Sequence, residues 1–398
     1  MNEHSHKNDP VTRFLELSCL SYSQTDGLDR IQAARDMLVQ QPELARKNVW
    51  TASCTGDMEA LKMLLDASPA LVRLKGGPFE WEPLLYAAYS RLNLPGRSTL
   101  DAARLLLKNR ADPNAHWMWG GQYRFTVLTG AFGEGESGPV HQPPHQDCEA
   151  LARLLLEAGA DPNDSQALYN TMFTPGNRCL EILLEFGLGP EAKCNWLVGS
   201  PPNLQPNPQR TLHYQMMWAI RKFHASRARL LMKHGADVTE SDGRQTPWKA
   251  AVLAGHLEII EDLMRHGARE ESLSSVEAFA AACMAGDHEH ASRLAVEDAG
   301  LCESTQRAMP ELLLNAASSD RREAVRCLVN AGWDPNAMPH GNSALHQAAW
   351  NGHLKMAMLL VELGARPDLR DKAHDATAAD WAEHSGHSDV AVYLANLA

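Results

Sequence analysis

The sequence predicts an all-α protein in which a repeat of about 33 residues is stacked into a solenoid of about eleven helix–turn–helix pairs with short inter-repeat hairpins. Three observations predict this fold. Glycines that end apolar runs recur every 32 or 33 residues, similar phrases surround these glycines, and the preceding runs place leucines at helical spacing. A chain with such a period is built from stacked units rather than from two or three separate globular domains.

The periodic glycines lie in the second half of the chain and are expected to take the left-handed conformation that ends a helix. They are Gly235, Gly267, Gly300, Gly332 and Gly364. Apolar runs such as ARLLLKN (103–109) and MAMLLVEL (356–363) carry leucines along one helix face. A shorter helix precedes each such run, as in QTPWKAAVLAGH (245–256), where Thr246 can cap the helix and Pro247 occupies its first turn.

The phrases TPWKAA (246–251), NSALHQAAWNGH (342–353) and EAGADPN (157–163) resemble the ankyrin repeat, whose family pattern is TPLHxAAxxGHxxxVxxLLxxGADxN. The resemblance covers nearly the whole chain and is strongest in 99–163 and 238–398. It implies stacked helix pairs that bind other proteins through hairpin tips and a concave groove. The ADPN turns are similar to those of bacterial ankyrin proteins.

The resemblance also implies structural roles for histidines, which are expected to hydrogen-bond hairpins and turns. His346 matches the TPLH position, while His256, His353 and His387 match the turn before the second helix. Two stretches depart from the pattern and are still expected to form helix–turn–helix units. They are residues 271–303 and 305–336.

The pattern divides the chain into N-terminal cap helices (1–43), a repeat solenoid (44–369) and a C-terminal capping repeat (370–398). Two inserts interrupt the solenoid. The first, residues 133–147, separates the two helices of one repeat, and the second, residues 189–210, forms a long hairpin between repeats. The second insert is expected to be extended because of its prolines at 201, 202, 206 and 208.

Composition restricts the class of protein. Hydrophobic residues make up 44% and charged residues 22% of the 398 residues, and the net charge is −12, which disfavours nucleic acid as a partner. The apolar runs are too short to cross a membrane, and the polar N-terminus does not resemble a secretory signal. Eight scattered cysteines are typical of reduced thiols. We therefore expect a cytoplasmic monomer with a protein partner and without nucleic-acid or membrane partners.

Aromatic side chains gather in the interrupted region. Some fall in inter-repeat hairpins and others near the groove position after the TPLH histidine, and exposed Trp and Tyr are typical binding anchors. Any one of these rings can alternatively pack between neighbouring hairpins. The residues expected to bind a protein partner are Trp81, Tyr86, Trp117, Trp119, Tyr123, Arg124, Tyr169, Asn170 and Trp218.

His141 and His145 are the candidate metal ligands, because two imidazoles near Asp147 and Cys148 have residue types that hold zinc. Two prolines between them argue against a helix, so a proline-stiffened loop and no metal are expected. The sequence lacks the GxSxG, HExxH and P-loop motifs. We therefore expect no catalytic residues and no cofactor.

The leading hypothesis is a non-catalytic protein–protein interaction module with a concave aromatic surface at residues 80–220. The alternative is a pocket protein, an enzyme included, in which loop 133–147 and the hairpin 189–210 close over the groove and a small molecule or a metal binds. The residues expected to line this pocket are His141, His145, Tyr169 and Asn170. A secreted effector with the same binding surface is a third hypothesis.

Overall fold

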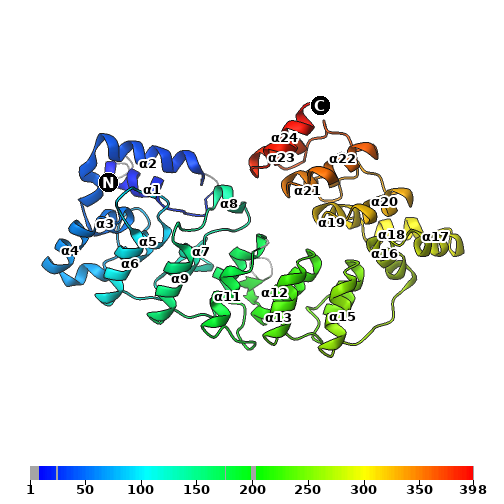
Figure 1. Cartoon of the computed structure of the whole chain (residues 1–398), viewed down its shortest axis with the longest axis horizontal. Helices are drawn as coiled ribbons and strands as arrows, with labels where there is room; N and C mark the ends of the chain where they lie inside the picture. The colour runs from blue at the N-terminus through cyan, green and yellow to red at the C-terminus, as the bar shows by residue number, and fades with distance from the viewer. Residues whose placement is uncertain (1–8, 24–25, 175, 199–202, 398) are drawn as a thin grey trace. The chain divides into compact units, whose positions relative to one another are not determined.

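The computed structural model describes residues 9–23, 26–174, 176–198 and 203–397. Within these residues the helices form eleven successive pairs, with two further helices, α8 and α18, outside the pairing (Figure 1). The predicted all-α repeat solenoid is confirmed. Contacts divide the chain into two compact units, residues 1–211 and 212–398.

The first unit stacks its helices in two layers. Helices α3, α5, α7 and α10 contact one another in that order and form the inner layer, while α4, α6, α9 and α11 form the outer layer. The helices of this unit are α1 (Pro10–Ser18), α2 (Leu28–Gln40), α3 (Val49–Thr55), α4 (Met58–Ala67), α5 (Pro83–Tyr89), α6 (Thr99–Lys108), α7 (Val127–Phe132), α8 (Gly138–His141), α9 (Cys148–Glu157), α10 (Ser165–Asn170) and α11 (Arg178–Glu185). Its strands are β1 (His116–Trp119), β2 (Tyr123–Thr126), β3 (Leu197–Val198) and β4 (Gln205–Pro206).

The second unit continues the same pairing. In its last repeats α19, α21 and α23 contact one another in order, and α20, α22 and α24 pack behind them. The helices are α12 (Thr211–Arg221), α13 (Ala225–Lys233), α14 (Pro247–Leu253), α15 (Leu257–Arg265), α16 (Ser275–Ala285), α17 (His288–Glu297), α18 (Leu301–Ala308), α19 (Leu312–Ser318), α20 (Arg322–Asn330), α21 (Ala344–Trp350), α22 (Leu354–Glu362), α23 (Ala378–His384) and α24 (Ser388–Ala395).

Four of the five periodic glycines have the predicted left-handed conformation, with φ between 88° and 101°. The expectation for Gly300 was wrong. Its φ is −92°, and it precedes the additional helix α18 instead of ending a helix. Leu301 and Thr305 of α18 are buried, so this helix packs into the unit at a place where the repeat pattern alone did not indicate one.

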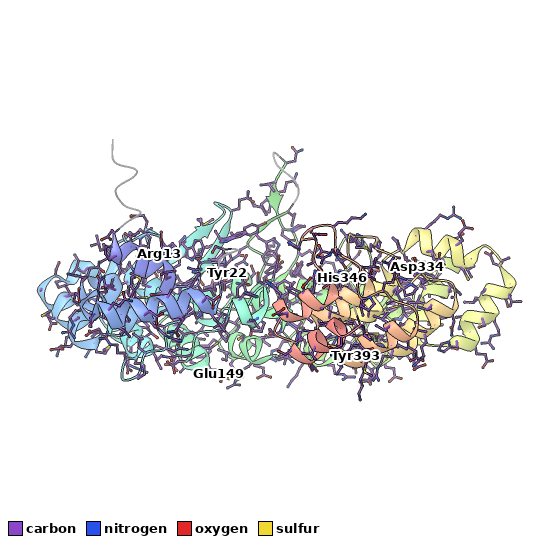
Figure 2. The ribbon with its side chains drawn as sticks, turned by 90° about the horizontal axis from the view of Figure 1, so that it is seen from above. Arg13, Tyr22, Glu149, Asp334, His346 and Tyr393 are labelled. Atoms are coloured by element: carbon purple, nitrogen blue, oxygen red, sulfur yellow. The ribbon has the colours of Figure 1, made fainter. Side chains whose placement is uncertain are left out.

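Helix caps and two of the predicted histidines, His346 and His353, stabilise the repeats as the resemblance implied. The Thr246 hydroxyl accepts a hydrogen bond from the Lys249 N–H, with Pro247 at the first helical turn. His346, on α21 (Figure 2), bonds to the Ser343 hydroxyl through Nδ1 at 2.8 Å and to the Ala376 carbonyl through Nε2 at 3.2 Å. The bond to Ala376 joins one repeat to the next, as does the bond of His353 Nε2 to the Ser318 carbonyl at 3.1 Å. The expectation of a side-chain hydrogen bond was wrong for His256, whose ring stacks on Phe223 and whose Nε2 has no partner among the described residues.

The two inserts differ in structure. Residues 133–147 contain the short helix α8, which corrects the expectation of a loop throughout. Residues 189–210 include the antiparallel strands β3 and β4, as expected for an extended hairpin. Pro201 and Pro202 of this hairpin lie outside the described residues.

All eight cysteines are free thiols, and five of them are buried. No helix among the described residues has both the length and the apolar composition needed to cross a bilayer.

Gly255 provides a test of how tightly neighbouring repeats pack. Its φ is +65°, and a Cβ there would lie 2.2 Å from the Met284 carbonyl oxygen of the next repeat. We expect Gly255→Ala to lower the free energy of unfolding by about 1–3 kcal/mol more than Gly267→Ala, because only Gly255 adds a backbone clash to the strain of a positive φ. Gly267 has φ +101° and open space at the Cβ position. Equal losses for the two variants, measured by urea unfolding, would contradict this close approach.

Candidate functional site

The β1–β2 hairpin is the central element of the predicted aromatic surface. Its strands pair with Trp117 opposite Phe125 and Trp119 opposite Tyr123. Since side chains alternate between the two faces of a strand, neighbouring residues of this hairpin meet different surroundings. By this alternation Trp117 and Trp119 share one face with Phe125 and Tyr123, while Met118 and Arg124 share the other face.

Trp117 and Phe125, which are farther from the hairpin turn, belong to an aromatic cluster that packs beneath the hairpin. Centroids of the Trp81 and Trp117 rings lie 5.2 Å apart, and those of Trp117 and Phe125 lie 5.3 Å apart. Such spacings are typical of favourable ring–ring packing. The members of the aromatic cluster are Phe79, Trp81, Tyr86, Tyr89, Trp117 and Phe125.

Burial corrects the expectation that Trp81 and Tyr86 face a partner. Both side chains are buried in the aromatic cluster, and the Tyr86 hydroxyl donates to the Gly76 carbonyl at 2.8 Å. Burial also raises the pKa of Tyr86. Asn170 is buried too, and its side-chain oxygen accepts from Gln166 Nε2 at 2.9 Å. These three residues support the fold from within the first unit.

Residues next to the hairpin turn, from both faces of the hairpin, are more accessible. Met118 is 47% exposed and Trp119 is 39% exposed. The Trp119 ring packs near Tyr123 with centroids 5.7 Å apart, and its indole N–H donates to the Tyr22 carbonyl at 3.0 Å. Arg124 is half-buried and donates to the Asn114 carbonyl at 3.2 Å. The tip is thus apolar, partly exposed and held in place by contacts at its base.

The remaining predicted residues do not join this tip. Tyr169 of α10 donates to a Glu136 carboxylate oxygen of the first insert at 2.6 Å and packs against Trp196, with ring centroids 5.4 Å apart. Trp218 belongs to the second unit, where its ring stacks on His224 at 5.2 Å. The predicted set is therefore divided between the hairpin tip, the interior of the first unit and the second unit.

Arg91 holds the first insert against the repeats. Its buried guanidinium donates to the Pro143 and Gly130 carbonyls, both at 2.7 Å, and to the Ser90 carbonyl at 2.9 Å. Burial lowers the pKa of Arg91, and the carbonyl oxygens compensate for lost hydration. The first insert is fixed at this point by backbone oxygens rather than by a carboxylate.

His145 has a structural environment. Its Nδ1 accepts from the Asp147 N–H at 3.0 Å, so Nε2 carries the proton and donates to the Thr99 hydroxyl at 2.7 Å. Burial, assisted by the nearby Arg91 charge, lowers the pKa of His145 to about 3. Both ring nitrogens are engaged by protein groups, which does not favour His145 as a metal ligand.

The alternative of a closed ligand pocket gains little support around His141. The cavity that His141 lines with Arg91 and Pro143 has a volume of about 10 Å³, enough for one water molecule. Among the described residues, no group of three or more His, Cys, Asp or Glu side chains is arranged to hold a metal ion. Glu134 of the same insert accepts a hydrogen bond from the Thr174 hydroxyl at 2.7 Å, so it contributes to holding the insert.

Sequence reasoning missed three residues of this region: Tyr22, Arg91 and Met118. Tyr22 lies in an N-terminal segment without a repeat phrase, and its partners Trp119 and Thr129 are far away in the chain. Arg91 was missed for the same reason, because its acceptors Gly130 of α7 and Pro143 of the first insert lie 39 and 52 residues away in the chain. Met118 could have been found, since it stands between two tryptophans of a hairpin strand.

The burial of His145 predicts that acid destabilises the first insert. Because its folded-state pKa lies below the ordinary value near 6.5, the stabilisation is present above pH 6.5 and is lost as the pH falls toward 3. Between pH 6.5 and pH 5 the loss amounts to up to about 2 kcal/mol. We expect His145→Gln to flatten the dependence of unfolding free energy on pH over this range. His116→Gln, a change at an exposed histidine, is the control; an unchanged slope in His145→Gln would contradict the assignment.

Comparisons with known proteins agree with this architecture. A family model described as ankyrin repeats, in three copies, matches residues 278–371. The Notch-regulated ankyrin repeat-containing protein of Xenopus laevis is 33% identical over 92 residues, which cover 23% of this chain and 79% of that protein. The Homo sapiens protein of the same name is 32% identical over 92 residues, with the same two shares. The espin-like protein of Homo sapiens is 45% identical over 58 residues, 15% of this chain and 6% of that protein. With its helix pairs, left-handed glycines and turn histidines, the chain belongs to the ankyrin repeat proteins.

Proposed function

We propose that the chain is a non-catalytic protein-interaction module that binds a partner protein through the tip of the β1–β2 hairpin. Ankyrin repeats are protein-interaction units, and stacked repeats lose little conformational freedom on binding because they are already ordered. The proposed surface consists of Met118, Trp119, Tyr123 and Arg124. It is narrower than the concave surface expected at residues 80–220, since several of the expected rings are buried.

The exposure of Met118 and Trp119 carries this proposal. Two large apolar side chains, 47% and 39% exposed, occupy adjacent positions at the end of one strand and so present apolar surface on both of its faces. The aromatic cluster beneath them keeps that strand in place. Exposed Trp and Met side chains on a fixed base are typical of interface anchors, because they can bury a large area without a large ordering cost.

The negative net charge of the chain supports a partner that is positively charged around the residues that contact these anchors. The net charge is −12, which favours association with a basic protein segment through long-range attraction. We also propose that residues 1–43 and 370–398 cap the two ends of the repeat array. A cytoplasmic location is part of the proposal, and the eight free thiols support it.

Met118→Lys tests the surface without touching the aromatic cluster. Proteins retained by the tagged full chain from an extract of its own source are quantified by mass spectrometry. We expect a protein retained by the wild type to fall at least tenfold with Met118→Lys, because a lysine charge opposes burial at the interface. Met264→Lys, at a methionine of the second unit that is 42% exposed, is the matched control.

The two variants separate surface effects from general ones. If the hairpin tip is the binding surface, Met264→Lys retains the partner protein at the wild-type level and Met118→Lys does not retain it. Equal retention by both variants, or equal loss from both, would contradict it.

A further inference from the structure

The segment between α1 and α2 crosses the first unit instead of making a tight turn. We call residues 18–23, which start at the last residue of α1, together with Asp26 the clasp. The clasp runs beside the end of α5, where the Leu20 N–H donates to the Tyr89 carbonyl and the Arg91 N–H donates to the Ser18 carbonyl, both at 2.9 Å. Cys19 and Ser90 form an antiparallel bridge there. The clasp is thus held to the end of α5 by main-chain hydrogen bonds, which can bind an extended peptide whatever its side chains.

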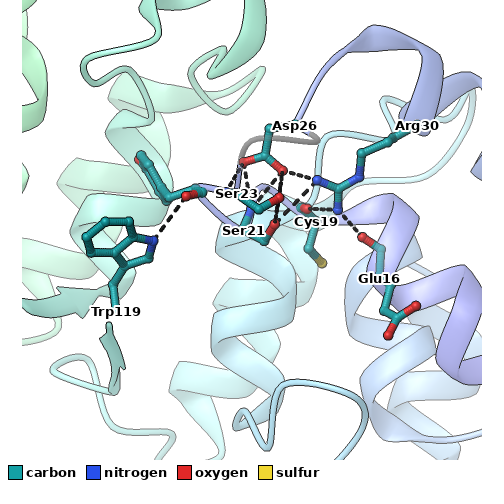
Figure 3. A network of polar contacts seen from close by, with 8 residues as sticks. Glu16, Cys19, Ser21, Ser23, Asp26, Arg30 and Trp119 are labelled. Carbon is teal, nitrogen blue, oxygen red and sulfur yellow. Dashed lines mark hydrogen bonds and ion pairs between the residues drawn. The ribbon is translucent and has the colours of Figure 1, made fainter. Parts of the chain in front are cut away.

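Tyr22 is the side chain that the clasp inserts into the repeats. Its ring is buried against Phe125 and Tyr89, with centroid separations of 4.7 and 6.5 Å. Its hydroxyl reaches the Thr129 carbonyl of α7 at 3.4 Å, and its own carbonyl accepts the Trp119 indole N–H (Figure 3). The inner layer and the β1–β2 hairpin together provide a seat for one aromatic ring, and Trp119 of the hairpin provides a donor for the adjoining peptide oxygen.

The first insert lies against the same clasp. A Cβ built at Gly135 would lie 3.4 Å from Cε1 of Tyr22, and one built at Gly27, just after the clasp, would lie 3.8 Å from His141 Nδ1. The first insert therefore packs against the segment that joins α1 to α2. An insert that shields a bound segment explains why both departures from the regular pattern occur in one place.

Polar contacts of Asp26 and Arg30, which we call the lock, keep the clasp in its bent conformation. The Asp26 carboxylate accepts from the backbone N–H groups of Ser21 and Ser23, both at 3.2 Å, and forms an ion pair with Arg30 (Figure 3). Arg30 also donates to the Cys19 carbonyl at 3.3 Å. Tyr22 has φ of 55°, an unfavourable value for a bulky side chain. The lock therefore stabilises a conformation that the segment would not adopt alone.

We propose that the inner face of α5 and α7 is a docking groove for an extended peptide that carries an aromatic side chain, and that the clasp is its internal occupant. A partner peptide with a tyrosine replaces Tyr22 in the seat, and the clasp leaves the groove as a unit. The inference rests on the proposed role as an interaction module. It concerns a covered surface of the inner layer and does not depend on Met118.

A synthetic peptide tests the groove directly. The probe is an end-capped, fluorescent peptide of residues 16–23 with Cys19 replaced by Ser, and its binding to the full chain is followed by anisotropy. The tethered clasp competes at a high effective concentration in the wild type. We expect Tyr22→Ala and Asp26→Asn to bind the probe at least tenfold more tightly than the wild type, because the first empties the seat and the second weakens the lock.

Two controls show whether the seat recognises the ring. Arg13→Ala alters an exposed residue of α1, paired with Glu16 at 3.9 Å, and should leave probe binding at the wild-type level. A probe with alanine in place of its tyrosine should lose at least tenfold in affinity for Asp26→Asn. If folded Tyr22→Ala and Asp26→Asn bind the probe no better than the wild type, or if the alanine probe binds equally well, the groove proposal is wrong.

Hydrogen exchange of the wild-type full chain tests the release of the clasp without any substitution. The Leu20 and Arg91 amides, which bridge the clasp and α5, should exchange together at least tenfold faster than the helical amides of α5 and α7. Exchange of these two amides only at the rate of the α5 and α7 core would show a permanent structural segment and overturn the proposal. Because the probe and the exchange experiment involve no partner from an extract, their failure is distinguishable from failure of the hairpin-tip proposal.

Discussion

Each helix pair of this chain can bury its apolar face only against the pairs before and after it. The last repeats show this constraint clearly, since the buried residues of α19, α21 and α23 form one continuous core with those of α20, α22 and α24. Alanines such as Ala316 and Ala348 lie on the contact faces, which lets the backbones approach closely. The left-handed glycines and turn histidines serve the same packing, because they set where one helix ends and the next begins.

Segments that depart from the regular repeat bury backbone N–H and C=O groups, and these groups need hydrogen-bond partners. The first insert does so through Arg91, whose guanidinium binds carbonyl oxygens of Ser90, Gly130 and Pro143. A carbonyl left without a donor in this position would destabilise the unit by an amount comparable to a lost hydrogen bond. Arg91 also carries a backbone N–H that bonds to Ser18, so one residue connects the insert, the repeat and the N-terminal segment.

Aromatic residues of the first unit have two different roles despite their similar chemistry. Trp81, Tyr86 and Trp117 belong to the aromatic cluster and support the hairpin from below. Met118 and Trp119 stand at its surface. Tyr22 belongs to neither group by sequence, although it occupies a seat in the inner layer. A partner that uses the hairpin tip and one that uses the seat would meet adjacent parts of the same unit, because Trp119 contacts Tyr22 directly.

The amino-acid sequence by itself determined the repeat, most helix ends and the caps, because these depend on residues close together in the chain. Thr246 with Pro247, the glycines with positive φ and the hairpin around Trp117 are local features of this kind. The exception of Gly300 arose because the same residue type can precede a helix as well as end one. Only the tertiary structure decided which rings are exposed and where the clasp lies. The bond from Trp119 to Tyr22 joins positions 97 residues apart, and the one from Tyr22 to Thr129 spans 107 residues. A periodic pattern specifies contacts between neighbouring repeats, whereas these contacts depend on a segment that crosses several repeats and has no period of its own.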